Sequence, residues 1–419
     1  MAEAAEASES FFGWLDYDER DAQRMREVFA AFDDKDTVDS LGLGVIRDAI
    51  SDQLFPGIST IQTRARYFFF VPWLCKMLEQ EAVPAAQFGK RLRDLEVALI
   101  ESLRATEGPN QGVIGYRARR KLERLPSTVY WNGLQVFGLR LLNLTIPEYR
   151  GAIQRLAAWG VLAERDDDGE LVARPRRMWD ADLPTAPPGF PDEPVSLLLT
   201  AAESEYLTGR IAAHCPDTLM SELAMDLTID RSVAAPWQVT LPSFSPRLSE
   251  LLRHSRNFAE LMEGAQALYN LLIARRAERL LDRDTSELQG RLSDELDEWE
   301  ATMDRRRAEL TSWIRGEEFW YFVERSSRVP TRTRRFVLAW ADLALADPTE
   351  IRDDTGAAAL ITEREYQLKG KLARLTEQRA LENWNGQPFA FGQLTFRWTN
   401  ARRILDDLQA HEGTVDAES

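Results

Sequence analysis

The chain has 419 residues, a formal net charge of −16 and a pI of about 4.9. Its length and its hydrophobic content of 44% exclude a disordered chain and indicate a globular protein of about two or three domains. Because so acidic a chain repels nucleic acid on average, any contact with DNA has to come from a local basic patch.

The cysteine and hydropathy patterns favour the cytoplasm. Cys75 and Cys215 lie in apolar stretches and form no CxxC motif, so we expect two buried thiols. Residues 1–10 lack the basic and apolar regions of a signal peptide, and no window has about 18 uncharged apolar residues. We expect a cytoplasmic protein with no membrane insertion.

Residues 1–125 are predicted to form an N-terminal helical domain. Apolar residues recur at helical spacing over 18–32, 43–54 and 85–103. Between the last two lies the most informative segment, in which a Pro-Gly turn leads to Ser59 and then to Gln62 three residues later. This spacing is typical of a capping box and predicts a helix that begins at Ser59 and ends at Pro72.

The first two turns of that predicted helix contain Arg64 and Arg66. Free backbone N–H groups at a helix start, together with two guanidinium groups, can hold an anion such as phosphate. The alternative is a structural role in which the two arginines form ion pairs with acids such as Asp48 or Asp52.

Residues 126–182 are predicted to form a winged-helix-like module. Two helices, over 127–142 and 145–159, precede two short strand-like runs that flank an Asp-Gly turn. This is the order of elements in a winged helix-turn-helix. Three arginines follow the second run, where a wing would meet a phosphate backbone: Arg174, Arg176 and Arg177.

A proline-rich linker is predicted over 183–194, because prolines at this density interrupt both helices and central strands. Residues 195–410 are predicted to form a helical C-terminal domain, and 411–419 an acidic tail. The expected helices of this half cover 194–213, 217–226, 245–254, 257–281, 285–314, 331–345, 362–384 and 396–408.

Two further basic runs are candidates for phosphate contact. The first, within 116–125, contains Arg117, Arg120 and Lys121, and its alternative is a solvated helix face. The second, within 324–336, places Ser and Thr hydroxyls between arginines, a mixture that suits phosphate oxygens. Its candidate residues are Arg332, Arg334 and Arg335.

The segment 396–403 mixes aromatic residues with arginines. Phe396 and Trp398 could stack on a base, although such residues more often pack in a core.

The sequence contains no catalytic or metal-binding motif. Its three histidines have no metal-ligand spacing, and it has no phosphate loop, glycine-rich dinucleotide motif or nucleophile elbow. We therefore expect no catalytic residue, no metal site and no cofactor.

Three segments resemble a bacterial family of unknown function: Phe12-Gly-Trp-Leu-Asp-Tyr17, the run FPGISTIQTRARYF over 55–68, and RWTNARRILDD over 397–407. The resemblance covers most of the chain. Members of the family occur beside helicase and nuclease genes in antiphage defence clusters, which implies a role in a defence complex. The resemblance transfers no catalytic residue.

The sequence thus predicts a mainly α-helical, multi-domain protein without enzymatic activity. We expect a subunit of a bacterial antiphage defence system that binds DNA through local basic patches or recruits an effector. One alternative is a protein scaffold for a helicase or nuclease without nucleic-acid contact. Another is a metal-dependent nuclease that uses scattered carboxylates.

Overall fold

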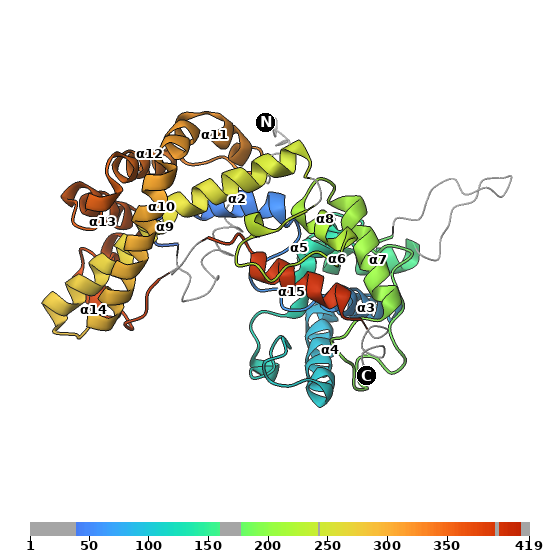
Figure 1. Ribbon diagram of the computed structural model, residues 1–419. Helices are drawn as coiled ribbons and strands as arrows, with labels where there is room; N and C mark the ends of the chain where they lie inside the picture. Colours follow the sequence, from blue (N-terminus) through green and yellow to red (C-terminus); the bar gives the residue numbers. More distant parts are fainter. Residues whose placement is uncertain (1–38, 160–176, 242–243, 390–393, 412–419) are drawn as a thin grey trace, which may run out of the picture. The chain divides into compact units, whose positions relative to one another are not determined.

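The computed structural model describes residues 39–159, 177–241, 244–389 and 394–411 (Figure 1). Over these ranges the chain is mainly α-helical and forms no strand, which confirms the predicted mainly-α class. The β-type pairing consists of isolated bridges, from Arg140 to Trp179 and from Leu199 to His411. None of the described helices combines the length and the apolar character needed to cross a membrane.

The chain divides into two compact units. Unit 1 contains the described residues before Val45, together with 260–316 and most of 329–393. Unit 2 contains the described parts of 45–259, 317–328 and 394–419, so both units are assembled from separate stretches of chain. The proline-rich segment 183–194 has no helix and belongs to unit 2.

Unit 2 is organised around α3 (Tyr67–Gln80), which contacts α4 (Ala85–Thr106), α5 (Pro126–Val136) and α6 (Ile146–Trp159). The first half of α3 is aromatic and is buried on all sides. The other α-helices of this unit are α2 (Gly44–Leu54), α7 (Ala201–His214), α8 (Leu219–Met225), the first part of α9 (Pro246–Leu281), α11 (Glu318–Glu324) and α15 (Trp398–Gln409).

The predicted helix start at Ser59 is wrong. Helix α3 begins at Tyr67, and Pro72 lies inside it rather than at its end. A proline inside a helix costs about 3 kcal/mol. Burial of the aromatic residues around it offsets that cost, since a fully buried Phe contributes about 1.5–3 kcal/mol.

Other predicted boundaries also shift. Helix α5 begins with Pro126 and ends at Val136, six residues before the predicted end. The predicted helices 245–254 and 257–281 form one helix, α9, because the helical backbone continues through Ser255 and Arg256. The predicted helix 362–384 is two helices, since Gly370 adopts a φ of 51° after α13.

The winged-helix prediction is met only in part. Helices α5 and α6 match its two helices, whereas the two strand-like runs of the wing fall outside the described residues. The module therefore stays a prediction.

Unit 1 is built from the rest of α9 with α10 (Ser286–Arg315), α12 (Thr331–Ala346), α13 (Thr355–Lys369) and α14 (Gln378–Glu382). Helix α12 contacts both α10 and α13. Short 3-10 turns complete the two units: η1 (Arg119–Lys121), η2 (Pro236–Gln238), η3 (Pro348–Glu350) and η4 (Gly370–Leu372).

Two tryptophans fix α10 and α12 against α9. The Nε1–H of Trp299 donates to the Glu260 carbonyl at 2.8 Å, and that of Trp340 donates to the Leu261 carbonyl at 2.9 Å. A side chain at Gly264 would overlap the Trp299 ring, since an added Cβ would lie 2.3 Å from it. The absence of a side chain at that position lets the indole reach the helix.

Glu96 joins α4 to the start of α5. Its Oε1 accepts a hydrogen bond of 2.7 Å from the Ser127 backbone N–H, and its side chain is completely buried. Burial raises the pKa of Glu96 to about 7, and the nearby Arg93 opposes this shift.

We predict that the native protein loses stability as the pH rises from about 4.5 to about 7, and that the Glu96→Gln variant does not. Because the pKa of Glu96 is higher in the folded state than in the unfolded state, the folded protein binds more protons across this window. Its stability is full below the window and falls by about 3 kcal/mol as the pH rises through it. Urea unfolding should show equal stabilities near pH 4 and a more stable variant at pH 8. A constant difference at both pH values would contradict this assignment.

Candidate nucleic-acid interface

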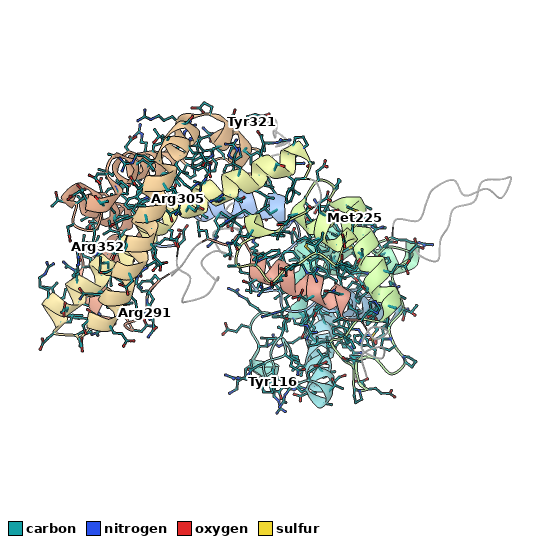
Figure 2. The ribbon with its side chains drawn as sticks, viewed as in Figure 1. Tyr116, Met225, Arg291, Arg305, Tyr321 and Arg352 are labelled. Carbon is teal, nitrogen blue, oxygen red and sulfur yellow. The ribbon has the colours of Figure 1, made fainter. Side chains whose placement is uncertain are left out.

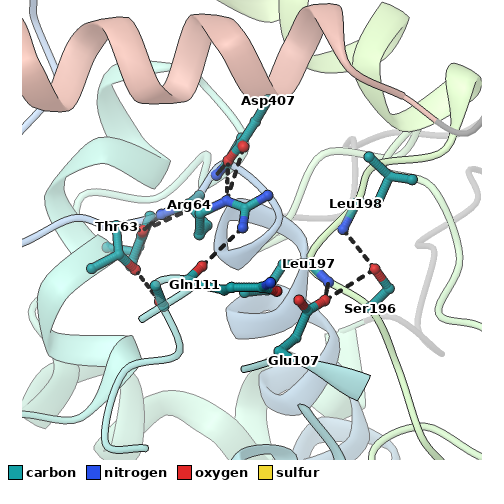
Figure 3. A network of polar contacts seen from close by, with 11 residues as sticks. Thr63, Arg64, Glu107, Gln111, Ser196, Leu197, Leu198 and Asp407 are labelled. Atoms are coloured by element: carbon teal, nitrogen blue, oxygen red, sulfur yellow. Dashed lines mark hydrogen bonds and ion pairs between the residues drawn. The ribbon is translucent and has the colours of Figure 1, made fainter. Parts of the chain in front are cut away.

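Arg64 is held by an acid from the far end of the chain. Its Nε donates to Asp407 Oδ1 and Oδ2 at 2.9 and 3.0 Å, and its Nη1 donates to the Gln111 carbonyl (Figure 3). The Ala65 N–H also donates to Asp407, at 2.7 Å. Burial raises the pKa of Asp407, and the Arg64 guanidinium opposes that shift. A carboxylate of this protein therefore takes up the donors that the sequence suggested for an external anion.

Arg66 is also paired, and it is only 5% exposed. Its Nε lies 3.0 Å from Glu203 Oε2, and its Nη1 donates to the Ser196 carbonyl at 2.9 Å. Glu203 belongs at the same time to a capping box with Thr200 at the start of α7. The Arg66 pair thus ties the start of α3 to the start of α7.

The backbone between Ser59 and Arg66 needs no helix because side chains satisfy its polar groups. The Tyr130 hydroxyl accepts from the N–H groups of Thr63 and Arg64 and donates to the Arg64 carbonyl. The Asn400 amide donates to the carbonyls of Thr60 and Gln62. This is the physical reason why the predicted capping pattern does not start a helix.

The expectation of structural ion pairs is correct, but the predicted acids are not the partners. Asp48 and Asp52 pair with Arg397, at 3.2 and 2.6 Å. Phe396 and Trp398 are buried, as expected for core residues. Through the bonds from Arg64 to Asp407 and from Asn400 to Thr60, the segments 55–68 and 397–407 contact each other. The sequence alone did not reveal this contact.

A different group of predicted cations does lie together on the surface. Residues 117–121, of sequence Arg-Ala-Arg-Arg-Lys, are all exposed and follow Tyr116 directly. Figure 2 shows nitrogen-tipped side chains around Tyr116. We call residues 107–125, which follow α4, the basic lobe. The stretch from 85 to 125 has nine Lys and Arg but five Asp and Glu, in a chain whose net charge is −16.

Only part of this positive charge is neutralised within the protein. Arg119 pairs with Glu101 at 3.2 Å, and Arg120 lies 3.7 Å from Asp94, both as exposed pairs. Arg117 and Lys121 are exposed cations near the same turn. Exposed pairs contribute about 0–1 kcal/mol, so Arg119 and Arg120 can exchange their carboxylates for phosphates at little cost.

The aromatic residue of the basic lobe is already engaged. The Arg104 guanidinium lies 4.9 Å from the centre of the Tyr116 ring, and Tyr116 is half-buried. Stacking on a base would need a free ring face. The lobe is therefore suited to the phosphate backbone more than to bases.

The remaining predicted residues are dispersed. Arg177 is exposed, whereas Arg174 and Arg176 lie outside the described residues. In unit 1, Arg332 and Arg335 are exposed near the start of α12 and Arg334 is half-buried.

Over the ranges that the structure describes, no three His, Cys, Asp or Glu side chains gather in a way that could hold a metal ion. Both cysteines are buried, and burial raises the pKa of each thiol, that of Cys215 to about 12. The described part of the chain therefore offers no cluster that could serve as the metal centre of the nuclease alternative.

The chain belongs to a family described as "Family of unknown function (DUF6361)", whose match covers residues 9–412. Comparison with curated proteins and with solved structures gave no match. The prediction of a family of unknown function that covers most of the chain is therefore confirmed, while the three motifs, the defence context and the activity remain predictions.

We predict that Asp407→Asn lowers the free energy of unfolding by about 3–5 kcal/mol, because it leaves the Arg64 charge without its carboxylate. Asp304→Asn is the control, since Asp304 pairs with Arg307 on the surface, where the two side chains are 68% and 40% exposed. The control should cost less than about 1 kcal/mol. Urea denaturation of both variants measures the difference. Similar small losses of stability in both would contradict the claim that the Arg64–Asp407 ion pair stabilises the fold more than an exposed pair does.

Proposed function

We propose that the protein is a non-enzymatic subunit of a bacterial antiphage defence system, and that it binds DNA through the basic lobe. The observation that carries the proposal is the exposed run of residues 117–121 on an otherwise acidic chain. Arginine and lysine side chains at this density attract phosphate oxygens. The role in a defence system rests on the family resemblance alone, whereas the DNA binding rests on the exposed cations.

The lobe supports binding that does not depend on base sequence. Its cations suit phosphates, and its Tyr116 ring is covered by Arg104. With about four cations at the turn, the affinity stays in the range of non-specific binding, about 10⁻⁴–10⁻⁶ M at physiological salt. The basic lobe would therefore act as an accessory contact beside a partner such as a helicase or nuclease, which would supply the stronger binding.

A scaffold without nucleic-acid contact is the second candidate, and exposed apolar side chains favour it. Tyr321 and Leu372 are each 72% exposed, and Met225 is 59% exposed. Exposed aromatic and Met side chains are enriched where proteins meet. In this case a partner protein would copurify, and DNA would show no measurable binding.

We predict that binding to a labelled DNA duplex of random sequence weakens linearly in a plot of log K against log salt, between about 50 and 200 mM. Replacing both Arg117 and Lys121 by Gln should reduce the slope by about 2, because each lost phosphate contact removes about 0.9. Fluorescence anisotropy measures both quantities.

The matched control for this experiment is Arg332→Gln with Arg335→Gln, which removes the same charge from the exposed start of α12. We expect its salt slope to equal that of the native protein. If the control loses salt slope and the lobe variant does not, the DNA contact lies at the start of α12 and the basic lobe is not the interface. If none of the proteins binds DNA, the scaffold without nucleic-acid contact is the better explanation.

A further inference from the structure

The guanidinium group of Arg93 binds the backbone of the basic turn to α4, in addition to the exposed ion pairs of Arg119 and Arg120. Arg93 lies in the middle of α4 and is half-buried. Its Nη2 donates to the carbonyl of Arg120 at 2.9 Å and to that of Leu122 at 2.7 Å. Both hydrogens of that nitrogen are therefore used within the protein, on the backbone of the segment that presents the exposed cations.

The turn needs such support because its backbone is unfavourable by itself. Arg119 has a φ of 50°, in the left-handed region, which costs a non-glycine residue about 1–2 kcal/mol. The Arg119 N–H donates to the Gly115 carbonyl, and beyond it a short 3-10 turn follows, with bonds from Lys121 N–H to Ala118 and from Leu122 N–H to Arg119. Isolated turns of this kind have little stability of their own.

Close packing also holds the turn against the helix. Gly115 has a φ of 82°, and an added Cβ there would lie 2.8 Å from the Leu122 side chain and 2.9 Å from that of Ile100. Gly115 therefore allows Leu122 to approach α4, and Arg93 binds the carbonyl of that same residue. Packing and hydrogen bonding converge on one short segment.

We infer that Arg93 is a positioning residue for the DNA contact: it holds the turn 119–122 so that the cations of residues 117–121 are ordered before DNA arrives. This inference rests on the proposed function of the basic lobe. An ordered turn binds more tightly because the entropy of ordering it is not lost on association. Arg93 itself does not need to touch a phosphate.

An experiment can distinguish positioning of the turn by Arg93 from a direct contribution of its charge to phosphate binding. Removing a cation that contacts phosphate changes the salt slope, whereas loosening the turn lowers the affinity and leaves the number of phosphate contacts unchanged. Lys90 supplies the matched control, because it is an exposed cation on the same helix. Lys90→Met removes the same charge without releasing the turn.

The test compares Arg93→Met, Arg93→Lys and Lys90→Met by anisotropy with the labelled duplex and by amide hydrogen exchange without DNA. We expect Arg93→Met to bind about tenfold more weakly with an unchanged salt slope, and to exchange the amides of Lys121 and Leu122 faster. Arg93→Lys should recover most of the affinity, since an ammonium group can donate to both carbonyls. Lys90→Met should leave exchange at these amides unchanged.

Two results would overturn the inference: equal losses of affinity in Arg93→Met and Lys90→Met, or unchanged exchange at Lys121 and Leu122 in Arg93→Met. A reduced thermal stability of Arg93→Met does not obscure the outcome, because Arg93→Lys keeps the charge and the donors. If the native protein binds no DNA while Arg93→Met still exchanges faster, the clamp on the turn stands and the proposed function fails.

Discussion

The ion pair between Arg64 and Asp407 is the contact on which the organisation of unit 2 depends. It joins residues 343 positions apart in the sequence, and Asp407 also accepts the Ala65 N–H. Together with the pair of Arg66 and Glu203, it holds an irregular segment in front of α3 and attaches α15 and α7 to it. Removing one partner of a buried pair costs far more than the pair contributes in net terms, so such contacts fix an arrangement once it has formed.

This arrangement decides which cations are left for a ligand. The arginines of the 55–68 segment serve the fold, whereas the cations of residues 117–121 stay exposed even where they pair with acids of α4. On a chain with a net charge of −16, a small positive surface attracts phosphate only at short range. Under the proposed function, such a surface favours brief contacts with nucleic acid over tight binding.

The sequence was sufficient where local rules decide the structure. Helix α4 follows from apolar spacing, and α6, α10 and α15 lie where the sequence predicts helices. It was insufficient at residues 59–66, whose hydrogen-bond partners Tyr130, Asn400 and Asp407 are distant in the chain. The sequence also predicted one helix ending at 254 and another beginning at 257, whereas α9 is continuous through both positions.

The candidate site shows the same division. The basic run that contains Arg117, Arg120 and Lys121 could be recognised from composition alone. Its attachment through Arg93 could not, because a helix arginine that binds two backbone carbonyls looks like any other charged residue in the sequence. The partners of Arg64 and Arg66 were hidden in the same way, since acids nearer in the sequence were available and were not used.

The late position of α15 has a consequence for biosynthesis. A ribosome makes the chain from its N-terminus, so residues 45–259 emerge long before Asp407 does, and all of the described part of unit 1 after Ala259 is translated in between. Until α15 leaves the exit tunnel, Arg64 has no carboxylate and the apolar surface that α15 later covers is open to solvent. Unit 2 thus completes its core only after residues 260–316 and 329–393 of unit 1 have been translated.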